Sequence, residues 1–229
     1  MQYQINIKIS PAGLQQIYAA NQLVTLAKTS SDIPGGFPLV WLTFQPFQLN
    51  QIVWNEDYSL YVTGTPLTLG SVITINSLTN GPAQLGWLYA FKSGFFQGQE
   101  GQGVNYSAAN QTSSTNPLGF GLAQSANVNG VSVLSPVNAV SLPVNQQVAF
   151  TPQEKVSIFL SSSGNGTIID SLPGNVLTVT LTPQNPVANA VYDDSAKSFK
   201  QVSENLAPSG PAGEKPKIGL EFVRSLTAA

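Results

Sequence analysis

Cysteine and histidine are both absent from this chain of 229 residues. Without cysteine there are no disulfides, thiol nucleophiles or thiolate metal ligands. Without histidine there is no imidazole to serve as a general base, as part of a Ser-His-Asp triad or as a metal ligand. We therefore expect no catalytic residues, no metal site and no cofactor, and a protein that is not an enzyme.

Charged side chains are also scarce, at 9% of the chain, where an average protein has about a quarter. The formal net charge is −2 at pH 7, and no basic run occurs. Nucleic-acid affinity depends on lysine and arginine contacts that release counterions from phosphates, so we expect no nucleic-acid binding. A nearly neutral surface favours instead a homo-oligomer or an uncharged partner, such as a neutral glycan or another cell-surface ligand.

Long hydrophobic runs are missing as well. No apolar stretch approaches the roughly 18 residues of a membrane-spanning helix, so no transmembrane segment is expected. Residues 1–9 alternate polar and apolar side chains and lack the basic and apolar segments of a secretory signal. This pattern predicts cytoplasmic synthesis without a signal peptide, and leaves open later release or assembly into particles.

Strand patterns dominate what is present. Hydrophobic residues make up 42% of the chain. Short β-branched and aromatic runs recur between Gly, Pro and Asn residues, and Asn129-Gly130 lies between two apolar arms as in a two-residue hairpin. Ser10 is a favourable N-cap before Pro11, which predicts one short N-terminal helix over residues 11–20. The predicted fold class is all-β, an antiparallel, jelly-roll-like β-sandwich with that single helix.

The pattern changes after Tyr192. Residues 1–192 are predicted to form a single β-sandwich domain. Residues 193–216 contain several prolines and glycines and are predicted to be a flexible linker. Apolar side chains then alternate again within residues 217–229, which predicts a C-terminal strand that docks on the same sheet or on a neighbouring subunit.

Carboxylates are the remaining candidates for catalysis, since a glycosidase needs only two carboxyl groups. Glu56 and Asp57 are adjacent between the strand patterns of residues 51–54 and 58–63, so they would point apart on a strand or lie in a solvated turn. A hairpin turn is favoured over a catalytic pair. No paired acidic motif stands out, so a glycosidase is a weaker hypothesis than the two non-enzymatic functions given below. The candidate acids are Glu56, Asp57, Glu100, Glu154 and Asp170.

Aromatic residues cluster just before a segment rich in Gly, Gln and Asn. Trp87, Tyr89 and Phe91 share one face of a predicted strand, and residues 97–117 are predicted to form a long loop. Buried rings would belong to the core, whereas exposed rings beside amides would suit sugar rings. Phe95 and Phe96, which lie between Gly94 and Gly98, are the better candidates for exposed rings. The predicted ligand-binding residues are Tyr89, Phe95, Phe96, Gln97, Gln99, Asn105 and Tyr106.

Two functional hypotheses follow from these features. The first is a non-enzymatic recognition protein, lectin-like or toxin-type, that binds a neutral glycan or a cell-surface or membrane ligand through the aromatics and amides. The second is a self-assembling structural protein, such as a capsid-like, filament or inclusion-body subunit, that exchanges its C-terminal strand. Ligand binding and particle size in solution distinguish the two.

Overall fold

The computed structural model describes residues 1–30, 35–101, 103–113, 116–204 and 206. Strands account for most of these residues, and the described part of the chain contains one helix, α1 (Pro11–Ala19). The Ser10 hydroxyl accepts a hydrogen bond from the Gly13 backbone N–H at 2.9 Å, so Ser10 is the predicted N-cap. The predicted all-β fold class with a short N-terminal helix is confirmed.

The largest sheet has nine strands. Its main path runs through β17 (Ser198–Val202), β16 (Val187–Asp193), β1 (Gln2–Lys8), β5 (Leu49–Thr63), β10 (Leu118–Val128), β12 (Asn138–Leu142) and β3 (Gly36–Pro38). Two further strands are attached to it: β11 (Val131–Pro136) pairs with β10, and β6 (Ser77–Leu78) pairs with β5.

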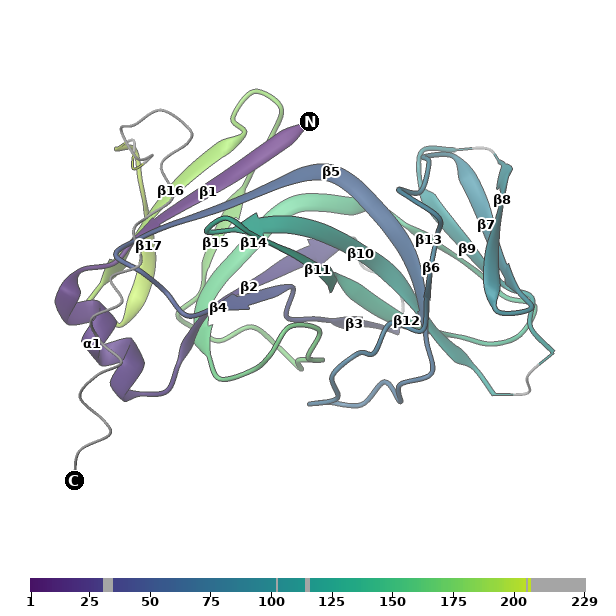
Figure 1. Cartoon of the computed structure of the whole chain (residues 1–229), viewed down its shortest axis with the longest axis horizontal. Helices are drawn as coiled ribbons and strands as arrows, with labels where there is room; N and C mark the ends of the chain where they lie inside the picture. The colour runs from purple at the N-terminus through teal and green to yellow at the C-terminus, as the bar shows by residue number, and fades with distance from the viewer. Residues whose placement is uncertain (31–34, 102, 114–115, 205, 207–229) are drawn as a thin grey trace.

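Two four-stranded sheets complete the fold. The first contains β15 (Leu177–Thr180), β14 (Pro152–Ser161), β2 (Leu23–Ser30) and β4 (Leu42–Phe44) in that order. The second, here called the small sheet, contains β13 (Gln147–Phe150), β9 (Tyr106–Asn110), β7 (Trp87–Lys92) and β8 (Phe95–Glu100). Figure 1 shows the small sheet at one end of the molecule and α1 at the opposite end.

One hydrophobic core joins the three sheets. Ile5 of β1, Ile158 of β14 and Phe91 of β7 belong to the same buried cluster. A smaller cluster contains Tyr61 and Ala123, which alternate along their strands with residues of the main core and so face the other side of the large sheet. Sheets packed around a shared core give the predicted sandwich-like arrangement.

Strand pairing is mostly antiparallel, as predicted, with two parallel exceptions. β1 pairs in parallel with β16, and β7 pairs in parallel with β9. The second case arises because β8 returns the chain to the start of β7, where β9 begins. The hairpin predicted at Asn129-Gly130 is confirmed: the two residues join β10 to β11 with φ angles of 52° and 88°, as a type I′ turn requires.

The turn predicted at Glu56 and Asp57 is wrong. β5 passes through both residues as one strand, bent over the core in Figure 1. Its register against β10 shifts at this point, so that residues 55–57 lie opposite Ser125 alone. This arrangement is a β-bulge, and a polar bulge in one strand resembles in sequence a polar turn between two strands.

The linker predicted to start at Asp193 is wrong for residues 193–202. Asp193 ends β16, and its carboxylate accepts hydrogen bonds from the hydroxyl and N–H of Ser195 and from the N–H of Ala196. These bonds, with that from Lys200, hold the pKa of Asp193 well below its usual range. They fix the turn into β17. The predicted C-terminal strand at 217–229 lies outside the described residues.

Candidate functional site

The small sheet carries most of the residues predicted to bind a ligand, with Asn105 just before β9. The long loop predicted over residues 97–117 is wrong for residues 97–100, which end β8, and for residues 106–110, which form β9. A two-residue turn at Ser93 and Gly94, both with positive φ, joins β7 to β8. All of the predicted residues except Asn105 therefore lie on strands.

The inner face of the small sheet belongs to the core. Tyr89 is 9% exposed and Tyr106 5% exposed, and burial raises the pKa of Tyr106 to about 12. The Phe96 ring lies 5.2 Å from Phe91 and 6.2 Å from Phe120, measured between ring centroids. Tyr89 thus follows the core alternative that the sequence left open, whereas Phe96, expected to be exposed, packs against the core, and Tyr106, expected in a loop, is buried.

The outer face presents Phe95, Gln97 and Gln99, which alternate along β8 and are exposed. Gln97 pairs across the sheet with Ala90 of β7, Ala90 with Ala109 of β9, and Ala109 with Gln147 of β13. Across the sheet, the two alanines Ala90 and Ala109 therefore lie between Gln97 and Gln147. Small side chains in the middle of the row leave room above the sheet.

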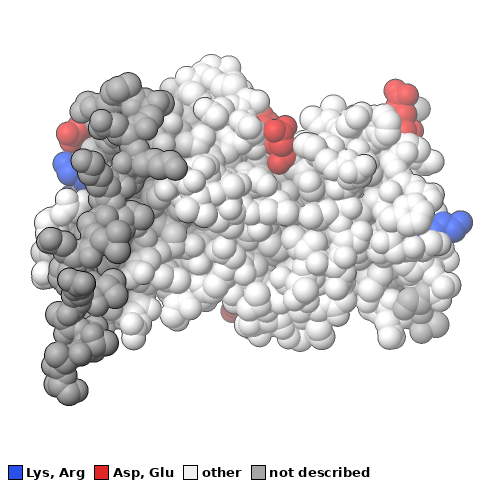
Figure 2. Space-filling model, viewed as in Figure 1, with Lys and Arg blue, Asp and Glu red and all other residues white. Residues whose placement is uncertain are grey.

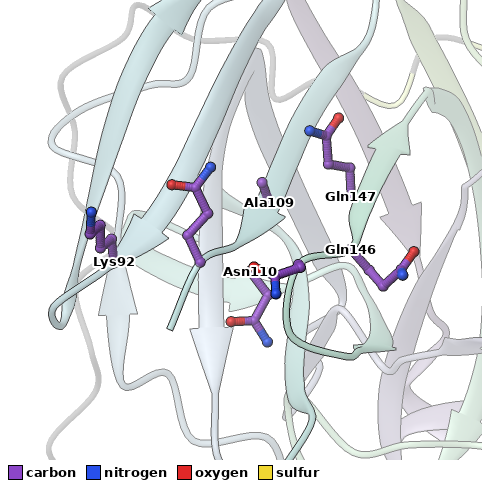
Figure 3. Close-up of a pocket in the computed structure, with 7 residues that line it drawn as sticks. Lys92, Ala109, Asn110, Gln146 and Gln147 are labelled. Atoms are coloured by element: carbon purple, nitrogen blue, oxygen red, sulfur yellow. The ribbon is translucent and has the colours of Figure 1, made fainter. Parts of the chain in front are cut away.

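A hollow of about 310 Å³ lies on this outer face, and we call it the amide hollow. Figure 3 shows Lys92 and Gln147 on opposite sides of Ala109. All but two of its residues are amides. The lining residues are Lys92, Ala109, Asn110, Gln111, Asn145, Gln146 and Gln147.

Asn110 links the segments that surround the hollow through hydrogen bonds. Its side-chain NH₂ donates to the Leu142 carbonyl at 2.8 Å, and its side-chain oxygen accepts from the N–H and hydroxyl of Thr112. Its backbone pairs with that of Asn145 and Gln146, at 2.7 and 3.0 Å. Asn110 is buried and fully used within the protein, so it positions the other amides and does not itself offer groups to a ligand.

The other four amide side chains that line the hollow can bind a ligand. Within the described ranges, the side chains of Gln111, Asn145, Gln146 and Gln147 make no hydrogen bond to the protein, and all four are exposed. Each offers one acceptor and two donors. Asn105, also predicted as a ligand residue, is half-buried, and its side-chain oxygen accepts from the Thr151 hydroxyl at 2.9 Å.

Sequence reasoning missed the residues that β13 and its preceding turn contribute. Gln146 and Gln147 are polar residues beside the short apolar run of residues 148–150, and they carry no other local signal. Their role depends on the pairing of β13 with β9, which no local pattern indicates.

A second polar cluster lies inside the core. The Lys28 ammonium is 2.5 Å from a carboxylate oxygen of Glu154, and their side chains are 1% and 7% exposed. Glu154 also accepts hydrogen bonds from the Tyr58 hydroxyl at 2.6 Å and from the Trp54 indole N–H at 2.8 Å. The Lys28 nitrogen lies 4.7 Å from the centre of the Trp41 ring. Both oxygens of this candidate acid are occupied, as in a structural ion pair.

Burial lowers the pKa of Lys28 to about 8, although Glu154 opposes the shift. An unfolded lysine titrates near about 10.4, so between these values the unfolded chain binds more protons than the folded one. The free energy of unfolding of the protein therefore rises with pH in this range, and Lys28 contributes at most about 1.4 kcal/mol per pH unit to the rise.

We expect wild type to gain stability relative to Lys28→Met between pH about 8 and about 10, measured by urea unfolding across that range. Tyrosine ionisation affects both proteins alike, so the difference isolates Lys28. A stability difference that does not change with pH would contradict this assignment.

No protein-family model, curated protein or solved structure matches this chain. Among the described residues, no helix is long and apolar enough to cross a membrane, and no group of three or more Asp and Glu side chains gathers as a metal site. Figure 2 shows few, scattered charges on the face it presents. Fold and site together define an all-β protein with an amide-lined surface hollow.

Proposed function

We propose that this protein is a recognition module that binds a neutral, hydroxyl-rich ligand, such as a glycan, at the amide hollow. The observation that carries the proposal is a hollow of about 310 Å³ lined by Ala109 and by four side-chain amides that make no hydrogen bond within the described part of the chain. An amide donates and accepts at neighbouring atoms, which matches adjacent sugar hydroxyls. The exposed Phe95 ring, opposite Lys92 in the β7–β8 pairing, suits the apolar face of a sugar ring.

Charge supports a neutral ligand. Of the residues that the structure describes, Lys92 is the only charged one that lines the hollow, and the chain as a whole has a net charge of −2. An anionic polymer would require several cations, and a cationic ligand would require a carboxylate. Neither is offered here, whereas amides lose little when they exchange water for hydroxyl partners.

A glycan array identifies the ligand, and calorimetric titration then measures variants. We expect Gln111→Ala with Gln147→Ala to bind at least about five-fold more weakly, because two hydrogen bonds of about 0.5–1.5 kcal/mol each are lost. Gln153→Ala is the matched control, since Gln153 is exposed on β14 and does not line the hollow. Unchanged affinity in the double variant, or no binding by wild type to any array glycan, would refute the proposal.

Phe95→Ala tests the ring contact separately. Phe95 is 52% exposed, so its removal should weaken binding without unfolding the protein. Phe96 is unsuitable for this purpose because its ring packs against Phe91 and Phe120.

Self-assembly stays a prediction, because the C-terminal strand that would be exchanged lies outside the described residues. β8 is the last strand of the small sheet, and an open sheet edge is where a second chain can pair. Truncation to test strand exchange should follow Leu206, because a cut after Tyr192 removes β17 and the buried Phe199. A mass that stays monomeric at high concentration would argue against assembly.

A further inference from the structure

The bulge in β5 places polar side chains on the outer face of the large sheet. Trp54 pairs with Ala126 and Tyr58 with Gln124, so three residues of β5 occupy the space opposite one residue of β10. The Gln124 side-chain NH₂ donates to the Asn55 carbonyl at 2.7 Å and so satisfies a backbone group that the bulge leaves unpaired. Bulges redirect side chains and are common beside functional sites.

A second hollow, of about 290 Å³, opens at this bulge, and we call it the bulge hollow. Three strands and one loop enclose it. The loop is fixed by hydrogen bonds from the Ala83 N–H to the Tyr58 carbonyl at 2.7 Å and from the Thr79 hydroxyl to the Gly81 carbonyl at 2.9 Å. The lining residues are Asn55, Asp57, Ser59, Gly81, Pro82, Ala123, Ser125 and Leu134.

Four polar side chains of this hollow are free. Across the described segments, the side chains of Asn55, Asp57, Ser59 and Ser125 make no hydrogen bond or ion pair with the protein, and no lysine or arginine lines the hollow. A carboxylate, two hydroxyls and an amide therefore face a space bounded by the apolar side chains of Pro82 and Leu134.

We propose that the bulge hollow binds a small ligand that carries a protonated amine and hydroxyl groups, an amino sugar or an amino alcohol. The Asp57 carboxylate pairs with the ammonium in a charge-assisted hydrogen bond. Ser59, Ser125 and Asn55 bind the hydroxyls, and Leu134, which is 45% exposed, packs against the carbon skeleton. The hollow is at the small end of the size range of ligand sites.

This site is separate from the amide hollow. The two hollows share no lining residue, lie on different sheets and have opposite charges, one with Lys92 and the other with Asp57. A calcium ion fits the bulge hollow less well than an amine does, because calcium takes about six to eight oxygen ligands and usually several carboxylates.

Glucosamine is the probe and glucose its uncharged counterpart, both titrated into the full chain and followed by NMR chemical shifts. We expect glucosamine to shift the resonances of residues that line the hollow, and glucose to bind at least about ten-fold more weakly. Asp57→Asn should reduce glucosamine affinity at least about ten-fold. Asp57 is exposed, so the variant should fold normally, and Asp170→Asn, at another exposed aspartate, should have no effect.

Three outcomes would overturn the proposal: equal affinity for the two sugars, no binding of glucosamine, or calcium chloride binding that depends on Asp57 in place of glucosamine. The amide-hollow variant Gln111→Ala with Gln147→Ala should keep full glucosamine affinity. The experiments therefore distinguish a wrong proposal for the bulge hollow from a wrong proposal for the amide hollow.

Discussion

Replacing Glu154 with alanine should lower the free energy of unfolding by about 3–5 kcal/mol, measured by urea titration. The change leaves the Lys28 ammonium, 1% exposed, without its anionic partner in a region that water does not reach. It also removes the acceptor of the Tyr58 hydroxyl and of the Trp54 indole N–H. A buried donor without an acceptor adds to the loss.

Two further variants identify the cause of that loss. Glu154→Gln keeps an acceptor for Tyr58 but not the negative charge, so its stability should lie between those of wild type and Glu154→Ala. Lys28→Met combined with Glu154→Leu removes both charges and should be more stable than Glu154→Ala, since apolar replacement of a buried ion pair is often tolerated. If the double variant is as unstable as Glu154→Ala, the unpaired ammonium is not the reason.

Gly121→Ala should destabilise the protein by about 3 kcal/mol or more, because overpacking against rigid backbone has few ways to relax. A Cβ at Gly121 would lie 2.0 Å from the Asn138 carbonyl oxygen and 2.6 Å from a ring carbon of Tyr61. That carbonyl already accepts the Tyr61 hydroxyl at 2.7 Å, and Asn138 also binds the Leu122 N–H. The new methyl group therefore disturbs a buried network in the middle of the large sheet.

Gly164→Ala is the matched control for this substitution. A Cβ at Gly164 meets no atom within 4 Å, so the change should alter the free energy of unfolding by no more than about 0.5 kcal/mol. Similar thermal or urea midpoints for the two variants would show that β10 can shift away from β12, against the packing described above.

Local patterns were enough to predict the fold class. Period-two runs such as residues 1–9 and the Asn129-Gly130 turn depend on neighbours in sequence, and both were confirmed. The β5 bulge was missed because residues 55–57 become a bulge only through pairing with β10, far along the chain. Taken alone, three polar residues between strand patterns have the composition of a turn.

The limits of the predicted linker were wrong for a different reason. The prolines and glycines that suggested it begin at Pro208, whereas residues 198–202 carry the buried Phe199, which packs on Tyr192 with ring centroids 5.3 Å apart. The two apolar residues of β17, Phe199 and Val202, do not alternate with period two, so this short edge strand was not recognised.

None of the residues predicted to bind a ligand lines the amide hollow itself. Phe95, Gln97 and Gln99 lie together on the outer face of the small sheet, where alternation along one strand would place them. Gln111, Asn145, Gln146 and Gln147 were not predicted, because only the contact between β9 and β13 brings them to the same hollow.

The position of β1 has a consequence for how the chain reaches its native state. β1 lies inside the large sheet, between β5 and β16, and its parallel partner is synthesised only after most of the described chain. Until then, one edge of β1 has no partner, and closing the sheet requires a contact between segments very distant in sequence. Refolding should therefore be slow for a protein of this size, and partly synthesised chains should be prone to aggregation through the open edge of β1.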